Sequence, residues 1–203
     1  MAGNFRDPMV GRDLLIGGML GLVHSTCINF GVLLPRWFGF VSPPSLSSNI
    51  RTLGSMRTML AGFLNGQVVT SIYVGFAFLF FLLLLYIILR RQWLATVALF
   101  VTALAIEVSA FAASAPRLYW IASILIALTI VTVVARFGLL ATMAAQLVFF
   151  LSLEYPMTTD FSVWYASSTI FALVIILGLA VYGFYISLGG QRVFAGRSFG
   201  LED

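Results

Sequence analysis

Two side chains in this sequence could do chemistry inside an otherwise apolar stretch, namely Glu107 and His24. A carboxylate surrounded by hydrocarbon costs about 2.5 kcal/mol or more unless it is neutralised or paired. Glu107 therefore needs either a bound proton or a partner, and Arg117 is one candidate partner. A proton or ion relay is one interpretation of Glu107. A structural hydrogen bond between helices, or to a neighbouring subunit, is the other.

His24 is the only histidine, and it lies at the middle of the first apolar block. A neutral imidazole nitrogen in an apolar pocket can ligate a haem iron or the magnesium of a chlorophyll-type pigment, which gives one interpretation. The other is a histidine that is hydrogen-bonded to another helix, for example to Glu107. The nearby small residues Gly17, Gly21 and Ser25 mark a helix face suited to close packing, so we expect another helix to lie there.

The groups that common membrane enzymes require are missing from the sequence. A single histidine provides neither a His-Glu-x-x-His zinc pair nor a metal cage, and no Cys-x-x-Cys-His motif attaches haem covalently. There is no phosphate-binding glycine loop. Cys27, the single cysteine, lies in an apolar block and is expected to be a buried, inert thiol. The sequence therefore predicts a protein that is not an enzyme.

These residues must be positioned by elements that are surrounded mainly by lipid. Of 203 residues, 61% are hydrophobic and only 9% are charged, and the mean hydropathy is +1.06, whereas a soluble domain is about 25% charged. Apolar blocks of roughly 20 residues are the length that spans a bilayer as a helix. We predict one all-α, polytopic membrane domain over residues 1–203, with about six transmembrane helices at residues 14–34, 68–89, 94–113, 118–135, 137–153 and 163–188.

The boundary between the fourth and fifth predicted spans depends on length. Only Arg136 interrupts the apolar residues 118–153, and a straight helix over this range would be about 54 Å long. A hydrocarbon core of about 30 Å cannot hold it. We therefore predict a tight hairpin at residues 135–138, in which Gly138 adopts a turn conformation that other residues resist.

The one long connection, residues 35–67, leaves two alternatives open. Apolar residues recur there at helical spacing, at Leu53, Met56, Leu60, Phe63 and Leu64. Such a pattern is typical of a helix lying on the outer membrane interface, here at about residues 45–67. The same residues could instead begin a long, tilted second span.

Arginine residues predict the orientation, because positively charged short loops stay cytoplasmic. With the amino end inside, seven arginines are cytoplasmic: Arg6, Arg12, Arg90, Arg91, Arg136, Arg192 and Arg197. Four lie outside: Arg36, Arg51, Arg57 and Arg117. This bias places both termini in the cytoplasm. The basic residues form no patch of the kind that binds nucleic acid.

The loop before the last span carries two acids, Glu154 and Asp160, and no base. Thr159, Asp160 and Ser162 can accept hydrogen bonds from the exposed amides at the start of a helix, so we predict that they cap the last span. Trp164 and Tyr165 are expected to lie at the headgroup level.

Several motifs of this chain are similar to those of a known membrane region. They are Arg6-Asp7-Pro8, Gly11-Arg12-Asp13-Leu14-Leu15, Arg136-Phe137-Gly138-Leu139-Leu140-Ala141, Thr158-Thr159-Asp160-x-Ser162-x-Trp164-Tyr165-Ala166 and Tyr182-Gly183-Phe184-Tyr185. Nearly the whole chain resembles the carboxy-terminal membrane region of some bacterial, notably acidobacterial, serine/threonine protein kinases. The resemblance implies a cytoplasmic kinase domain ahead of the first span, but the kinase motifs are missing here, so no catalytic residue carries over.

Four functions follow as hypotheses for a multi-pass protein of the bacterial inner membrane. The leading one is a non-catalytic accessory or structural subunit of a larger membrane complex, surrounded by lipid and other subunits. Its contact surfaces would be the Gly17–Gly21–Ser25 face and the outer interfacial helix. The second is a pigment- or haem-binding accessory subunit of a photosynthetic or respiratory complex, with His24 as axial ligand. The third is a membrane anchor or sensor for a separate kinase, and the fourth is a small carrier or channel.

Overall fold

The computed structural model describes residues 7–37, 39, 55–111 and 119–188, and every regular element in that part of the chain is helical. The α-helices are α1 (Pro8–Trp37), α2 (Met56–Gly62), α3 (Val69–Leu89), α4 (Gln92–Phe111), α5 (Tyr119–Thr132), α6 (Gly138–Glu154) and α7 (Ala166–Ser187). Two π-helical segments, η2 (Phe63–Val68) and η3 (Val133–Phe137), join α2 to α3 and α5 to α6.

Five helical runs are long and apolar enough to cross a membrane: Pro8–Gly31, Met56–Leu89, Gln92–Ser109, Trp120–Glu154 and Ala166–Ser187. Many of their large apolar side chains are exposed, among them Tyr73, Phe80, Ile87 and Leu177. Hydrocarbon is the solvent that such a surface requires. The predicted all-α, multi-pass membrane fold is therefore confirmed.

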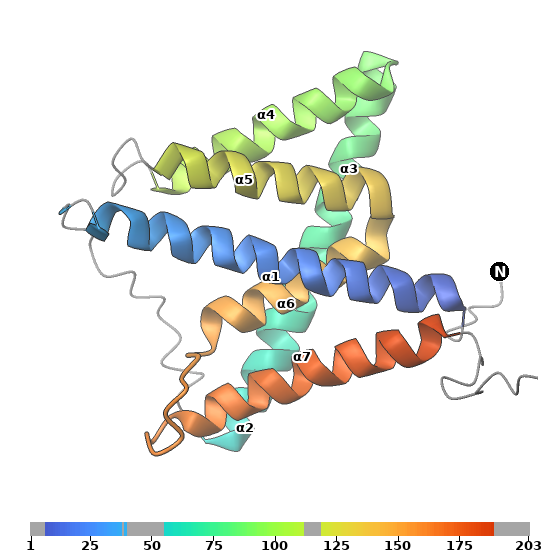
Figure 1. Ribbon diagram of the computed structural model, residues 1–203. Coiled ribbons are helices and arrows are strands. Elements are labelled where there is room, and N and C mark those ends of the chain that lie inside the picture. The colour runs from blue at the N-terminus through green and yellow to red at the C-terminus, as the bar shows by residue number, and fades with distance from the viewer. Residues whose placement is uncertain (1–6, 38, 40–54, 112–118, 189–203) are drawn as a thin grey trace, which may run out of the picture.

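Helix α1 lies at the centre of the molecule and packs against α5, α6 and α7 (Figure 1). The helix behind it, α6, is the most buried of the described helices, and half of its buried residues are small, among them Ala141, Ala144 and Ala145. Small residues let helix backbones approach closely, and close approach is what holds helices together where lipid offers no hydrophobic driving force.

The run Trp120–Glu154 reverses direction at Gly138, whose φ of 77° lies in the left-handed region (Figure 1). The two arms, α5 with η3 and then α6, are each about 25–30 Å long, which is close to the thickness of a bilayer core. The hairpin predicted at residues 135–138 is confirmed. Because the run Trp120–Glu154 folds back on itself, it provides two of the six predicted spans.

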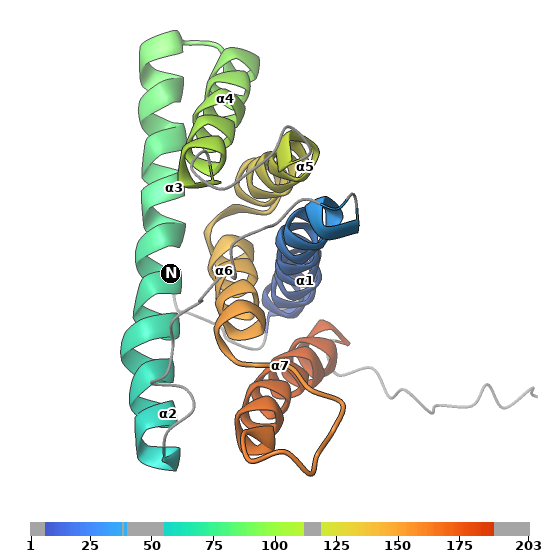
Figure 2. The ribbon, with the colours of Figure 1, turned by 90° about the vertical axis from the view of Figure 1, so that its left-hand side faces the viewer.

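Helices α2 and α3 form one continuous run, Met56–Leu89, of 34 residues. At about 51 Å this run is longer than a bilayer core. It lies along one side of the molecule and crosses the other helices at a steep angle (Figures 1 and 2). Residues 56–67 of the predicted interfacial segment belong to the same helical run as the second predicted span. Residues 45–54 of the predicted interfacial segment lie outside the described residues.

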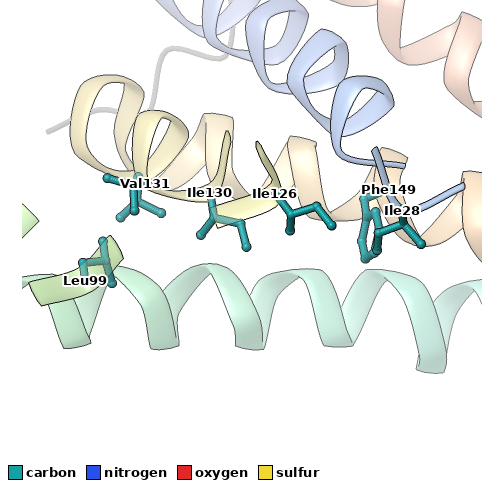
Figure 3. Close-up of a cluster of buried hydrophobic side chains, with 7 residues drawn as sticks. Ile28, Leu99, Ile126, Ile130, Val131 and Phe149 are labelled. Atoms are coloured by element: carbon teal, nitrogen blue, oxygen red, sulfur yellow. The ribbon is translucent and has the colours of Figure 1, made fainter. Parts of the chain in front are cut away.

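An apolar cluster joins α3 to the rest of the fold. It contains Ile28 of α1, Leu99 of α4, Ile126, Ile130 and Val131 of α5, Val134 of η3 and Phe149 of α6 (Figure 3). Phe78, Phe81, Leu82 and Leu85 of α3 pack against it. The cluster brings together side chains of α1, α4, α5 and α6, so the contacts of α3 with it fix where the long run lies.

Two element boundaries differ from or sharpen the sequence prediction. Helix α1 begins at Pro8, earlier than expected, because the Asp7 carboxylate accepts a hydrogen bond from the Met9 amide at 2.9 Å and proline suits a first helical position. Helix α3 ends at the predicted arginine pair, where Arg90 adopts φ 52° and its amide donates to the Tyr86 carbonyl.

The predicted capping of the last helix by Thr159, Asp160 and Ser162 is wrong. Helix α7 begins only at Ala166, its N-cap is Tyr165, and no side chain bonds there. Asp160 instead accepts hydrogen bonds from the amide and hydroxyl of Ser162, at 2.9 and 2.6 Å, and closes a turn within the loop. These side chains act locally because they lie too many residues ahead of the first exposed helical amides.

Candidate functional site

His24 lies in the interior of the fold, with 5% of its surface exposed. Its ring stacks almost parallel on Phe149 of α6, with ring centroids 4.0 Å apart. The Nε2 atom is buried and has no hydrogen-bond partner among the described residues. An unpaired buried polar atom costs about 1–3 kcal/mol, so this nitrogen is an unusual group for the interior.

A small cavity of about 10 Å³, close to the least space that holds one water molecule, lies beside the imidazole. Its lining comes from α1, α5, η3 and α6: Leu20, His24, Thr129, Ile130, Val133, Thr142, Ala145 and Gln146. The hydroxyls of Thr129 and Thr142 donate to the carbonyls of Leu125 and Gly138, at 2.8 and 2.7 Å. Their oxygens keep free lone pairs, so two residues of the cavity lining, the half-buried Thr129 and the buried Thr142, carry hydrogen-bond acceptors.

The glycines of α1 bring His24 this close to α6. A Cβ atom added to Gly17 would lie 2.9 Å from Cβ of Ala144, and one added to Gly21 would lie 3.1 Å from Cα of Ala145. Ser25, on the same face, is also buried. The Gly17–Gly21–Ser25 face therefore packs inside the chain and is not free to bind a partner subunit.

The arrangement does not fit a haem or a chlorophyll-type pigment on His24. Phe149 covers one face of the ring, and the cavity beside it has room for about one water molecule. Ligand pockets for larger molecules have volumes of about 300–1,000 Å³. A macrocycle could reach Nε2 only if α1, α5 and α6 separated.

Glu107 lies on the packed face of α4, one turn beyond Ala103, which is buried together with Ala95 and Leu99. It is half-buried, and none of the described residues forms a hydrogen bond or ion pair with it. The bond to His24 that one interpretation expected is not formed. Its other candidate partner, Arg117, lies outside the described residues. The structure therefore does not connect Glu107 to the His24 cavity.

A second polar site, which the sequence analysis missed, joins η2 to the end of α6. The side chain of Gln67 is 2% exposed, and its Nε2 donates a hydrogen bond to the carboxylate of Glu154, 87 residues away. The hydroxyl of Ser71 donates to the Gln67 carbonyl at 2.5 Å. Oε1 of Gln67 is buried and has no partner among the described residues. These groups form a polar contact between the long run Met56–Leu89 and the end of α6.

Three further hydrogen bonds extend this site toward the loop before α7. The Tyr155 hydroxyl donates to the Met59 carbonyl at 3.1 Å, and the Ser168 hydroxyl lies 3.4 Å from the Met59 sulfur. The Thr169 hydroxyl donates to the Pro156 carbonyl at 2.6 Å. Burial, together with the charge of Glu154, raises the pKa of Tyr155 to about 12. This tyrosine therefore remains a neutral donor at physiological pH.

The sequence carried only a weak signal for this second site. Gln67 reads as part of the polar side of a surface helix, and Glu154 reads as an acid of the following loop. No local spacing links the two. Among the described residues, no three His, Cys, Asp or Glu side chains lie close enough to hold a metal ion.

Comparison with protein-family models, with curated proteins and with solved structures finds no match to this chain.

Proposed function

We propose that this protein is a non-catalytic accessory subunit of a membrane complex, and that a transmembrane helix of its partner packs on α2 and η2. The observation that carries the proposal is the open surface over Gly62 and Gly66. A Cβ atom added to either glycine would meet nothing within 4 Å. By contrast, Gly11, Gly17 and Gly21 all lie against backbone atoms of neighbouring helices of this chain.

The four-residue spacing of Gly62 and Gly66 is the pattern by which transmembrane helices approach one another closely. Thr58, Asn65 and Val69 flank the pair and are exposed, and we call these five residues the α2–η2 face. None of the described residues bonds to the Asn65 side chain. An amide at the surface of an apolar helix gains more from a hydrogen bond across helices than from lipid, so the α2–η2 face fits a protein partner.

The rest of the exposed surface of α3 has a different character. Its exposed residues are large and apolar, for example Phe76, Phe80 and Leu83. Bulky apolar side chains keep helix backbones apart and match lipid chains. The partner contact is therefore assigned to the α2–η2 face, and lipid to the remainder of this run.

The orientation proposed for the chain places the α2–η2 face near the outer, non-cytoplasmic side. Arg12, Arg90, Arg91 and Arg136 are exposed. The start of α1, the α3–α4 turn and the α5–α6 reversal, which carry them, lie toward the same end of the molecule (Figure 1). The positive-inside rule makes this end cytoplasmic, together with both termini. Helix α2 begins toward the opposite end.

Site-specific photo-crosslinking in cells tests this proposal. A photoreactive amino acid at Val69, three residues beyond Gly66, should give an adduct with a different membrane protein. The same probe at Val181, three residues beyond the equally open Gly178 of α7, should give none. Gly66→Leu should abolish the Val69 adduct, and Gly178→Leu should leave it intact. Both substitutions enter open space, so neither should unfold the chain.

Three results would contradict the proposal. Adducts with lipid alone would mean that the α2–η2 face has no protein partner. An adduct of twice the mass of the chain would mean that it binds a second copy. A partner carrying a kinase domain would replace the accessory-subunit assignment with that of an anchor for a separate kinase.

A further inference from the structure

We infer that the cavity beside His24 holds one water molecule that hydrogen-bonds to Nε2 and joins α1 to α5 and α6. The inference does not depend on the proposed function. It starts from the unpartnered Nε2 atom, which belongs to a side chain that is 95% buried and lines the cavity. Buried water typically occurs where polar groups would otherwise have no partner.

The other polar groups of the lining decide which small molecule fits. The hydroxyl protons of Thr129 and Thr142 are already donated to backbone carbonyls, so both oxygens can only accept from the cavity. A molecule with two donors and at least one acceptor is complementary to two such oxygens and an imidazole N–H. Water has this pattern, and Gln146 in the lining offers a further donor or acceptor.

A metal cation is a poor match for the same space. No acidic side chain is among the residues that line the cavity, so a cation would lack a compensating charge in the membrane interior. The small volume also excludes polar molecules of more than a few atoms. With both threonine oxygens accepting from the water, Nε2 of His24 must carry the proton that the water accepts.

Because His24 is the only histidine of the chain, its imidazole can be observed alone. Protein labelled with [15N]histidine and reconstituted in lipid nanodiscs should show a single imidazole, protonated at Nε2. That proton should give a cross-peak to a water molecule of long residence time. Thr142→Val, which removes one acceptor, should abolish the cross-peak and shift the His24 nitrogen resonances.

Thr102→Val is the matched control, because Thr102 of α4 also donates to the carbonyl four residues earlier, at 2.9 Å, but does not line the cavity. It should leave the His24 signals unchanged. If Thr142→Val fails to fold, as judged by circular dichroism, Thr129→Val makes the same test. A wild-type imidazole without a water cross-peak, or with Nε2 unprotonated, would overturn the inference. The inference would also be overturned if a folded Thr142→Val or Thr129→Val variant kept the cross-peak between His24 and water.

Discussion

The substitution Gly21→Ala tests whether the close approach of α1 to α6 holds the fold together. The added Cβ would overlap the carbonyl oxygen of Ala145 and would lie 3.1 Å from its Cα and carbonyl carbon. These are backbone atoms, so no side-chain rotation can make room. The two helices must instead separate by about 1 Å, which weakens dispersion contacts along the whole interface.

The neighbouring Gly18 provides the matched comparison. A Cβ there would meet only side-chain atoms of Leu179 and Val148, at 3.9 Å, which is ordinary contact. Overpacking costs about 1–3 kcal/mol, and alanine gains about 1 kcal/mol over glycine in a helix. We therefore expect Gly21→Ala to destabilise the protein by up to about 2 kcal/mol net, while Gly18→Ala stabilises it by up to about 1 kcal/mol.

Reversible unfolding in mixed micelles with increasing dodecyl sulfate, followed by circular dichroism, measures these differences. Gly17→Ala should behave like Gly21→Ala, because its Cβ would overlap the carbonyl of Ala141. The double substitution should cost less than the sum, since one helix displacement relieves both overlaps. Equal shifts for Gly18→Ala and Gly21→Ala, or strict additivity of the pair, would refute the close-packing argument.

Three further predictions use the same unfolding assay or a pH titration. Arg90→Gly should stabilise the protein by about 1 kcal/mol, because Arg90 has φ 52° and a left-handed conformation strains any residue with a Cβ. A loss of stability would show that the charge of Arg90 contributes more to stability than the relief of this strain. Tyr155→Phe should cost about 0.5–1.5 kcal/mol by removing the hydrogen bond to Met59. Because the folded pKa of Tyr155 is raised from 10.0 to about 12, wild-type stability should also fall as pH rises between these values, and Tyr155→Phe should flatten that fall. The hydrogen bonds from Ser162 lower the pKa of Asp160. The turn that they close should therefore persist at neutral pH and be lost only as pH falls below the usual pKa of 3.8, which Trp164 fluorescence can follow. Ser162→Ala should move that loss to higher pH.

The sequence identified those features of the fold that depend on hydrocarbon thickness and local backbone chemistry. The reversal at Gly138 follows from length, because one straight helix cannot fit a bilayer. The end of α3 follows from the paired arginines Arg90 and Arg91, which interrupt the apolar residues. Both signals lie within a few residues of the element that they define.

The polar sites depend on contacts that no local pattern encodes. Gln67 and Glu154 are 87 residues apart, and each has an ordinary explanation at a helix surface or in a loop. The small residues of α1 correctly indicated a packing face, but the sequence did not indicate that α6 of the same chain occupies it. The capping prediction failed because it assumed that the helix begins beside Ser162, whereas α7 begins at Ala166.

The position of the α2–η2 face follows from the polar contact on the other side of the same run. In lipid, apolar helix faces are interchangeable, so a helix is oriented by its few specific contacts. Gln67 bonds to Glu154, Met59 accepts from Tyr155, and Gly75 lies against Met143. Together these contacts fix the rotation of the run about its own axis. With that side held, Gly62 and Gly66 are turned away from the rest of the chain and remain open to a neighbouring helix.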